Sequence, residues 1–352
     1  MPMSKIEGGL FAAPNFGGTG RLMDMWNSNN IYFVDAVNGS TGGPGKDPET
    51  PFALPSEAIT ACAMGASIYI KPYILDQSLT AGQGVYYTDD IVIPYEKSGI
   101  ALVGCGNPNP HNYAGVGIKP STVTGTLIEI KSNSNLIENM HLTLAGGTSD
   151  SATGTNPQAI ILMRRVITAG SLSRTYGNTV RGCRFSDDKS HPTSTPACLT
   201  SSIALGCAVH TIIEDNIFED CLGGIVMQSV IGNQEDTTVR RNVFGGKPSA
   251  RDCDIVLSIN NASCVNITIF DNIFADGKPH HVGGSHRRFI SMPYVDYGTG
   301  ILANNYFASS TVSNAMGEST GGTDSIVAEN FFFCGNYYQG SGTTAPYGLI
   351  TT

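Results

Sequence analysis

The sequence of 352 residues is poor in charge, because Asp, Glu, Lys and Arg make up only 14% of it. Its net charge is −9, and this acidic balance argues against a nucleic-acid partner, which would need a basic face. The chain also lacks any apolar run near the roughly eighteen residues that a membrane span requires. We therefore expect neither nucleic acid nor a membrane among its partners.

Two further features bear on the compartment in which the chain folds. The amino terminus, Met1–Glu7, has neither a basic segment nor an apolar core, so we expect no secretory signal. The nine cysteines are an odd number without the CxxC spacing of metal sites. Reduced thiols that pack as small apolar groups are favoured over a disulfide framework. These features predict folding in a cytoplasm.

What the chain does contain is a repeated six-residue motif. Five copies are clear and two are weaker: Ile213–Phe218, Val239–Phe244, Ile269–Phe274, Leu302–Phe307 and Val327–Phe332, then Ile137–Leu142 and Val180–Phe185. Counted from the fourth residue of each copy, the spacings are 43, 33, 26, 30, 33 and 25 residues. A constant motif with a varying period is typical of a solenoid whose loops differ in length.

The residue types within the motif predict a strand, a sharp corner and a second strand. An apolar residue and two mostly polar ones precede the fourth position, which is Asn in the five clear copies, and two apolar residues follow. Asn tolerates the left-handed backbone of a corner, and its side-chain amide can bond to the Asn of the next coil. We therefore expect an internal ladder of Asn216, Asn242, Asn272, Asn305 and Asn330.

A second recurring strand accompanies the motif, at Ser202–Leu205, Gly224–Met227, Asp254–Leu257 and Phe289–Met292. Each coil then carries about three short strands, and stacked coils roughly 4.8 Å apart bury one apolar column. This pattern resembles the right-handed parallel β-helix of the pectate-lyase-like superfamily over roughly residues 31–340. The resemblance implies an all-β solenoid, a scaffold that hosts lyases, hydrolases and non-enzymatic virion proteins.

The sequence divides into four parts. Residues 1–30 form a glycine-rich arm with the only tryptophan, which either covers a subunit or attaches to a larger assembly. Residues 31–97 are the entry and cap module, with a helix over Pro55–Met64 that has Ser56 as its N-cap. Residues 98–339 hold the coils, and residues 340–352 are a tail that leaves them.

Charged residues beside the motif are first interpreted as structural. Glu138, Arg181, Glu214 and Arg240 follow the first apolar position of successive copies, so they predict one outward column of alternating sign. Each exposed pair in such a surface ladder is worth only ~0.2–1 kcal/mol, and we discount Glu214 and Arg240 as catalytic candidates. The column becomes apolar at Phe270, Ala303 and Ala328, which makes that stretch a candidate subunit interface.

Two clusters remain as candidate sites. His280, His281, His286, Arg287 and Arg288 lie in one excursion that could bind an anionic sugar, a metal or an acidic chain; a solvated loop between subunits is the favoured alternative. Acidic residues lie at coil edges: Asp187, Asp188, Glu219, Asp220, Glu235, Asp236, Asp252 and Asp254. Pectate lyases use clustered acids and an arginine, and β-helix glycosidases pair carboxylates, but no spacing here singles out a pair. We expect no catalytic residue, metal or cofactor.

These observations favour a non-enzymatic phage virion protein, either a capsid decoration or a short spike, built as a homotrimeric β-helix. Its expected partners are copies of itself, capsid or tail proteins through the arm, and host-surface polysaccharide. The expected location is the virion, after synthesis in the host cytoplasm. The alternatives are a tailspike enzyme that cleaves host glycans and a bacterial polysaccharide lyase.

Overall fold

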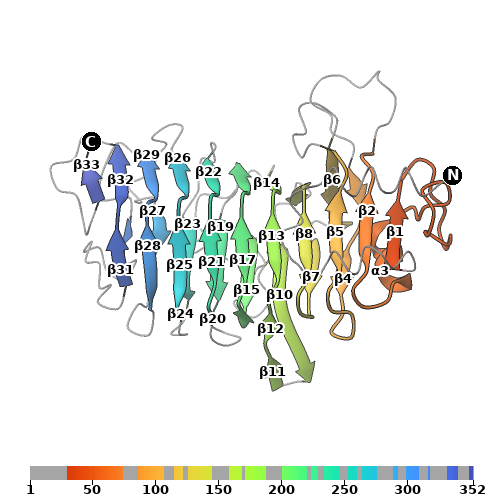
Figure 1. The fold of residues 1–352 in the computed structure, drawn as a ribbon, viewed down its shortest axis with the longest axis horizontal. Coiled ribbons are helices and arrows are strands. Elements are labelled where there is room, and N and C mark those ends of the chain that lie inside the picture. The colour runs from red at the N-terminus through yellow and green to blue at the C-terminus, as the bar shows by residue number, and fades with distance from the viewer. Residues whose placement is uncertain are drawn as a thin grey trace.

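The protein is a right-handed parallel β-helix whose coils stack along one long axis (Figure 1). The computed structural model describes residues 30–73, 86–106, 115–121, 126–144, 158–168, 171–187, 200–219, 223–228, 234–245, 253–259, 264–275, 288–291, 299–308, 316–317, 331–339 and 349–351. One apolar core, from Tyr32 to Phe331, runs through these coils. No single coil could bury such a core alone.

Two ten-stranded sheets flank the corner that the motif predicts. Sheet A contains, in order, β1 (Ile31–Val34), β2 (Ser67–Ile70), β5 (Ala101–Gly104), β8 (Leu136–Glu138), β13 (Thr179–Arg181), β17 (Ile212–Glu214), β21 (Thr238–Arg240), β25 (Ile267–Phe270), β28 (Gly300–Ala303) and β31 (Phe331–Cys334). Sheet B contains β3 (Tyr87–Thr88), β6 (Val116–Lys119), β9 (Met140–Leu144), β14 (Arg184–Asp187), β18 (Ile217–Glu219), β22 (Val243–Gly245), β26 (Ile273–Ala275), β29 (Tyr306–Ala308), β32 (Asn336–Gln339) and β33 (Leu349–Thr351). The entry segment therefore supplies the first strands of the same sheets as the coils.

Two further sheets complete the coils. Sheet C contains β4 (Ile91–Ile93), β7 (Ile128–Ile130), β10 (Gln158–Thr168), β15 (Thr200–Gly206), β19 (Gly223–Gln228), β23 (Cys253–Ile259), β27 (Arg288–Ser291) and β30 (Met316–Gly317), and β11 (Ser171–Ser173) pairs antiparallel with β10. Sheet D contains β12 (Thr175–Tyr176), β16 (Ala208–Val209), β20 (Gln234–Glu235) and β24 (Cys264–Val265). The middle coils thus have four strands rather than the expected three.

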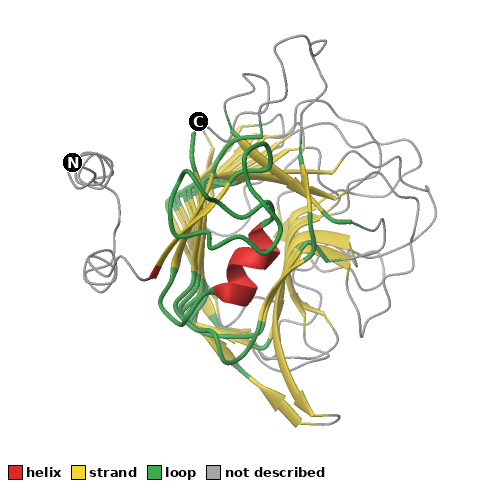
Figure 2. Cartoon of the chain, turned by 90° about the vertical axis from the view of Figure 1, so that its right-hand side faces the viewer, coloured by secondary structure: helices red, strands yellow, loops and turns green. Residues whose placement is uncertain are grey.

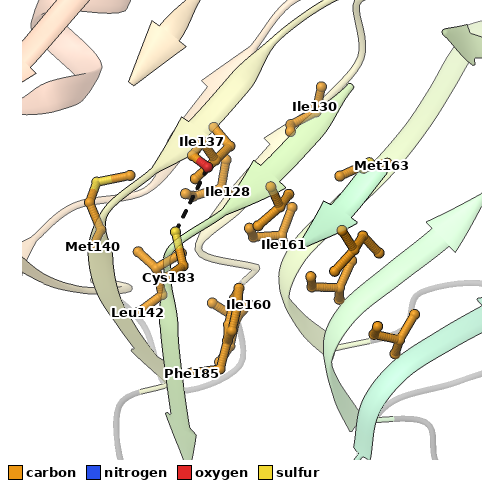
Figure 3. Close-up of a cluster of buried hydrophobic side chains, with 14 of the residues drawn as sticks. Ile128, Ile130, Ile137, Met140, Leu142, Ile160, Ile161, Met163, Cys183 and Phe185 are labelled. Atoms are coloured by element: carbon orange, nitrogen blue, oxygen red, sulfur yellow. Dashed lines mark hydrogen bonds between the residues drawn. The ribbon is translucent and has the colours of Figure 1, made fainter. Parts of the chain in front are cut away.

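Parallel register places equivalent side chains above one another. Inside sheet B, five phenylalanines stack with ring centroids 4.6–4.9 Å apart and planes within 8° of parallel: Phe185, Phe218, Phe244, Phe274 and Phe307. Inside sheet C, isoleucines align from coil to coil: Ile91, Ile128, Ile161, Ile203, Ile225, Ile255 and Ile290. Figure 3 shows how side chains from several of these coils meet around Cys183, whose thiol lies 3.8 Å from the Ile137 carbonyl oxygen.

The corner between sheets A and B turns at the residue before the predicted Asn. Positive φ occurs at Asn139, Asp215, Arg241, Asp271 and Asn304, with values of 52–59°, and at Gly182 and Gly335. The expectation that the fourth-position Asn takes the left-handed backbone is therefore wrong. That Asn instead points its amide into the column, and the third residue of the motif makes the turn.

The buried asparagines form the internal ladder through these inward amides. Asn216 Nδ2 donates to Asn242 Oδ1, Asn242 Nδ2 to Asn272 Oδ1, and Asn272 Nδ2 to Asn305 Oδ1, each at 3.0 Å. Asn305 Nδ2 then donates to Asn336 Oδ1 at 2.9 Å. Asn330, which the sequence assigned to the last rung, lies outside the described residues, and Asn336 occupies that rung.

The last motif copy was therefore placed six residues too early. Strand β31 pairs Leu302 with Phe333 and Ala303 with Cys334, so the last corner is Gly335-Asn336. The segment Val327–Phe332 fits the motif in sequence, but the strand pairing shows that the last copy begins at Phe333. Within the expected carboxyl-terminal tail, β33 pairs with β32 and extends sheet B.

Helix α3 (Pro55–Ala61) lies across the amino-terminal end of the coils (Figure 2). It ends three residues before the predicted Met64, and its N-cap is Leu54 rather than Ser56. The Ser56 amide instead donates to Asp89 Oδ2 at 2.8 Å, while Glu57 accepts from the Leu54 amide. No helix of the described residues is long and apolar enough to cross a membrane.

Candidate functional site

The outer face of sheet B carries two kinds of side chain in register, polar ones on the amino-terminal coils and apolar ones on the carboxyl-terminal coils. Side chains alternate along each strand, so every coil that buries a phenylalanine also turns its two neighbours outward. The first outward column contains His141, Arg184, Ile217, Val243, Ile273, Tyr306 and Tyr337 in register. This column is polar on its amino-terminal coils and apolar on its carboxyl-terminal coils.

A chain of three polar side chains spans the polar coils. His141, which is 4% exposed, approaches the Ser186 hydroxyl with Nε2 at 2.6 Å. On its other side, Nδ1 of the same ring lies 3.3 Å from the Tyr86 hydroxyl, and the two rings are 5.4 Å apart. A serine hydroxyl against one imidazole nitrogen, with the other nitrogen held, is the arrangement of a nucleophile and its general base.

The neighbouring pair on this face is Arg184 and Glu219. Arg184 lies beside His141 in register and two residues before Ser186, and its guanidinium contacts the Glu219 carboxylate. The Arg184 side chain is 13% exposed. The polar half therefore places one cation and one carboxylate directly beside the serine and histidine.

The apolar half is a stripe along the axis, which we call the outer stripe: Ile217, Val243, Ile273, Tyr306 and Tyr337. Four of its side chains are 36–46% exposed, and Val243 is half-buried. The parallel outward column two residues on contains Gly245, Ala275 and Ala308. Because these side chains are small, they do not cover the exposed apolar residues beside them. The surface of another molecule can therefore contact the stripe.

On the outer face of sheet A, the charged column lies in register as an ion ladder. Arg181 Nε lies 2.7 Å from Glu138 Oε1, and Arg240 lies 2.6 Å from Glu214 Oε2. Arg241 joins the ladder from the corner, 2.9 Å from Glu214. The column continues as Phe270, Ala303 and Cys334; Ala328, expected at that place, lies outside the described residues. Both Glu214 and Arg240 are thus engaged in coil-to-coil pairs.

Other described carboxylates are also engaged. Glu235 lies 2.8 Å from Arg174, Glu129 lies 3.1 Å from both Arg164 and Lys131, and Asp215 lies 2.7 Å from Arg241. Asp236 accepts from the Asn266 amide at 2.6 Å and lies 3.4 Å from His210. Most of these contacts fix the carboxylates to other coils; the contact of Glu129 with Lys131 lies within one coil.

The histidine-rich excursion lies mostly outside the described residues. His280, His281, His286 and Arg287 are not described, and Arg288 is placed only as the first residue of β27, paired with Cys253. Asp188, Asp220 and Asp252 also lie outside, and Asp187 and Asp254 are described as strand residues alone. Within the described ranges, no three His, Cys, Asp or Glu side chains are grouped closely enough to hold a metal ion.

Sequence reasoning missed the polar chain and the outer stripe. Tyr86, His141 and Ser186 are 55 and 45 residues apart, and only coil stacking brings them together. The outer stripe did leave a signal, because it is the fifth position of each motif copy: Ile217, Val243, Ile273 and Tyr306. The sequence pattern alone does not separate the two apolar residues that follow the corner, although alternation along the strand sends one of them outward.

Comparison with known proteins shows likeness in structure only. No protein-family model matches the sequence, and no curated protein does. A rhamnogalacturonan lyase is similar with 14% identity and a TM-score of 0.56, over 90% of this chain and 75% of that one. A pectate lyase has 13% identity and a TM-score of 0.52, over 89% and 76%. A pectin methylesterase mutant in complex with a hexasaccharide has 12% identity and a TM-score of 0.50, over 91% and 92%. The chain therefore shares the pectate-lyase-like right-handed parallel β-helix fold with these two lyases and the methylesterase.

Proposed function

We propose that the protein is a non-enzymatic structural component of a phage virion, a capsid decoration or short spike in which copies of the chain associate. Contact with host-surface polysaccharide through the excursions of the coils is part of the proposal. The observation that carries it is the engagement of outward-facing carboxylates by arginines of other coils, as in the pairs of Glu138, Glu214 and Glu235.

Carboxylates have different roles in a structural scaffold and in a glycan-cleaving enzyme. An enzyme of this kind needs acids that exchange protons with the glycan or hold a metal, at a defined separation. A carboxylate that an arginine of another coil holds in place instead stiffens the column along its axis. Several such charges in a network contribute more stability than an isolated ion pair. The described coils follow the second pattern, which suits a rigid rod.

The polysaccharide part of the proposal draws on the fold. The similar lyases and the methylesterase complex are named for pectic polymers or solved with a hexasaccharide, and at 12–14% identity they share the fold with this chain. A surface of stacked coils presents repeating positions at roughly 4.8 Å, which suits a repeating polymer. We therefore propose host-surface glycans as ligands, with no particular sugar assigned.

The test is a panel of capsular and lipopolysaccharide glycans incubated with the purified protein. Binding is read by biolayer interferometry, and cleavage by viscosity, new reducing ends and the ultraviolet absorbance of unsaturated products. We expect binding of at least one glycan without any cleavage. Loss of viscosity or release of oligosaccharides would overturn the non-enzymatic proposal, and absence of all binding would remove the glycan part.

A second candidate function is hydrolysis of an ester on a glycan, favoured by the 2.6 Å contact between Ser186 Oγ and His141 Nε2. In that reaction Ser186 Oγ attacks the ester carbonyl while His141 takes the hydroxyl proton and passes it to the leaving alcohol. Water then attacks the acyl-serine, His141 takes its proton, and the carboxylic acid leaves with regeneration of Ser186. Labelling by a fluorophosphonate probe would favour this candidate if Ser186→Ala abolished it and Ser202→Ala did not.

A further inference from the structure

We propose that the outer stripe of sheet B is the surface through which copies of this chain associate, side by side and in parallel, around an axis that runs along the column. This inference rests on the proposed function, which already requires association of copies. It names the face, the residues and the arrangement, none of which the proposed function assigns.

The shape of the stripe gives the first argument. Ile217, Ile273 and Tyr337 mark a line one side chain wide that follows five successive coils, roughly 20 Å at the coil spacing. When identical parallel rods surround a common axis, each rod contacts the others along a narrow line that runs parallel to its long axis. A surface for one globular partner would instead extend across the sheet as well as along it.

The period of the stripe gives the second argument. Its apolar side chains recur once per coil, at the rise of a parallel β-helix. A partner that matches every rung must present apolar groups at the same spacing, and a second copy in parallel register does so. Each residue then meets its own counterpart at the axis, so that Ile273 faces Ile273 and Tyr337 faces Tyr337.

Charge gives the third argument. The chain has a net charge of −9, so copies repel one another wherever carboxylates face each other. The outer stripe and the small residues Gly245, Ala275 and Ala308 beside it carry no charge. Glu219, at one end of that second column, is already engaged by Arg184. The stripe itself therefore brings no carboxylates together. In the corner column on its other side, Asp215 is paired with Arg241, and Asp271 is the remaining carboxylate.

Area decides between a pair and a ring. The five stripe residues, four of them 36–46% exposed and Val243 half-buried, offer on the order of 350 Å², given the ~150–250 Å² of a large side chain. A standard interface takes roughly 800 Å² from each partner. The stripe alone is therefore too small for a stable pair. In a ring of three, each copy meets two neighbours, so its contacts extend to the columns on both sides of the stripe and bury additional area.

A polysaccharide fits the stripe less well than a second copy. Sugars are bound by aromatic rings together with polar groups that bond to the hydroxyls. Of the five stripe residues only the two tyrosines offer a ring and a hydroxyl, whereas Ile217, Val243 and Ile273 have aliphatic side chains without donors or acceptors. Uncharged apolar side chains together with tyrosine are instead typical of the centre of a protein interface.

The test compares the wild type with Ile273→Lys and with Val265→Lys as the matched control. Val265 is also an exposed strand residue, 37% against 43% for Ile273, but it lies on β24 of sheet D, and both variants change the net charge equally. Multi-angle light scattering should give three times the 37.1 kDa chain mass for the wild type and for Val265→Lys. The Ile273→Lys variant should dissociate to single chains at concentrations at least tenfold above those that dissociate the wild type.

Two outcomes overturn the inference in distinguishable ways. If Ile273→Lys remains associated while it folds normally, the copies meet through another face, and the association in the proposed function survives. If the wild type is a single chain at all concentrations, the association fails as well, whereas the glycan panel still tests the rest of the proposed function.

A second variant tests the same surface in case Ile273→Lys does not fold. Tyr337→Cys should form covalent dimers with a short thiol cross-linker, because a parallel ring brings the introduced thiols of neighbouring copies together at the axis. Val265→Cys, with the wild type as blank for the native thiols, should stay at background. An antiparallel pair would separate the two introduced thiols along the column, so absence of cross-linking in an associated Tyr337→Cys protein would overturn the parallel arrangement.

Discussion

Asparagine stabilises these corners through its side chain, while the residue before it supplies the turn. Asn242 shows the division of roles. Its Oδ1 accepts from the backbone amide and the Nδ2 of Asn216, and its own Nδ2 donates to Asn272 and to the Ile213 carbonyl. The preceding Arg241 has a φ of 52° and carries the strain of the turn. One fully buried side-chain amide therefore bonds to two backbone groups of the preceding coil and to the asparagine side chains of the coils on either side.

Replacing Asn242 with Leu should lower the free energy of unfolding by ~1–3 kcal/mol, because buried groups on Asn216 and Asn272 lose their partner. The measurement is equilibrium denaturation followed by circular dichroism. The matched control is Asn304→Gly at an exposed corner position with a φ of 52°, which should change stability by less than ~0.5 kcal/mol because glycine adopts this backbone readily. Equal midpoints for Asn242→Leu and the parent would contradict the ladder.

Asp35 is expected to make the protein sensitive to acid. Burial alone would raise the pKa of this carboxyl, but hydrogen bonds from Lys71, from the Asn38 side chain and from the amides of Val37 and Asn38 lower it to about 2. A carboxyl whose folded pKa is depressed stabilises the fold above its unfolded value of 3.8, and that contribution disappears as pH falls to about 2. We expect a loss of about 2 kcal/mol over this interval.

The Asp35→Asn variant isolates that contribution. At neutral pH it should be less stable than the wild type, and between pH 4 and about pH 2 the difference should shrink, because the wild type alone loses the ionised carboxylate. Thermal denaturation across this range checks the expectation. A difference that stays constant with pH would contradict it.

At the scale of elements, the stacked rings inside sheet B join consecutive coils. Phe244 lies 4.6 Å from Phe218 and 4.9 Å from Phe274, with nearly parallel planes. Because each ring packs on its neighbours from two coils, a gap at one position removes contacts from both. The core of this protein is therefore divided by residue type, with phenylalanine inside sheet B and isoleucine inside sheet C.

Truncation of Phe244 to Ala should cost ~3–5 kcal/mol, since the ring is fully buried and its removal leaves a cavity between two rings. Val92→Ala on sheet C is the control, because Val92 is 42% exposed and should lose less than ~0.5 kcal/mol. Urea denaturation measures both variants. A small effect of Phe244→Ala would mean that neighbouring coils collapse into the gap.

The sequence predicted these elements wherever local pattern and pairing agree. The motif placed six strands of sheet A correctly, from β8 to β28, because apolar spacing and corner chemistry recur there. It failed at the last coil because Asn330 and Asn336 both precede aromatic residues, and only pairing with Leu302 distinguishes them. It also failed to separate inner from outer positions after the corner, where Ile217 and Phe218 are both apolar.

At the scale of the whole molecule, function-bearing groups meet through the stacking of coils rather than through local sequence. His141 and Ser186 lie on adjacent strands because one complete coil, through sheets C, D and A, separates them and returns the chain to sheet B, whatever the length of its loops. A variable period hides such a pairing from sequence analysis, since no fixed separation relates the two residues. The polar chain thus follows from the register of the strands, which the sequence does not display.

The two ends of the column are closed differently. At the amino-terminal end, α3 is held by Asp89 at its first turn and by Lys97, whose Nζ donates to the carbonyls of Ile59 at 2.5 Å and Thr60 at 2.6 Å. At the other end of the described coils, sheet B finishes with the three-residue strand β33. A solenoid is held by contacts between neighbouring coils, so the coils with the weaker cover should open first.

Hydrogen exchange followed by mass spectrometry should therefore show slow exchange in β17, β21 and β25, intermediate exchange in β1 and β2, and the fastest exchange in β31 to β33. Lys97→Met should speed exchange in α3 and β1 by roughly fivefold, because the two part-exposed hydrogen bonds together contribute ~1 kcal/mol. Exchange in β31 should not change, because Lys97 contacts only the amino-terminal end. If Lys97→Met accelerated hydrogen exchange equally in all coils, the column would open as one cooperative unit. The difference between its two ends would then not determine which coils open first.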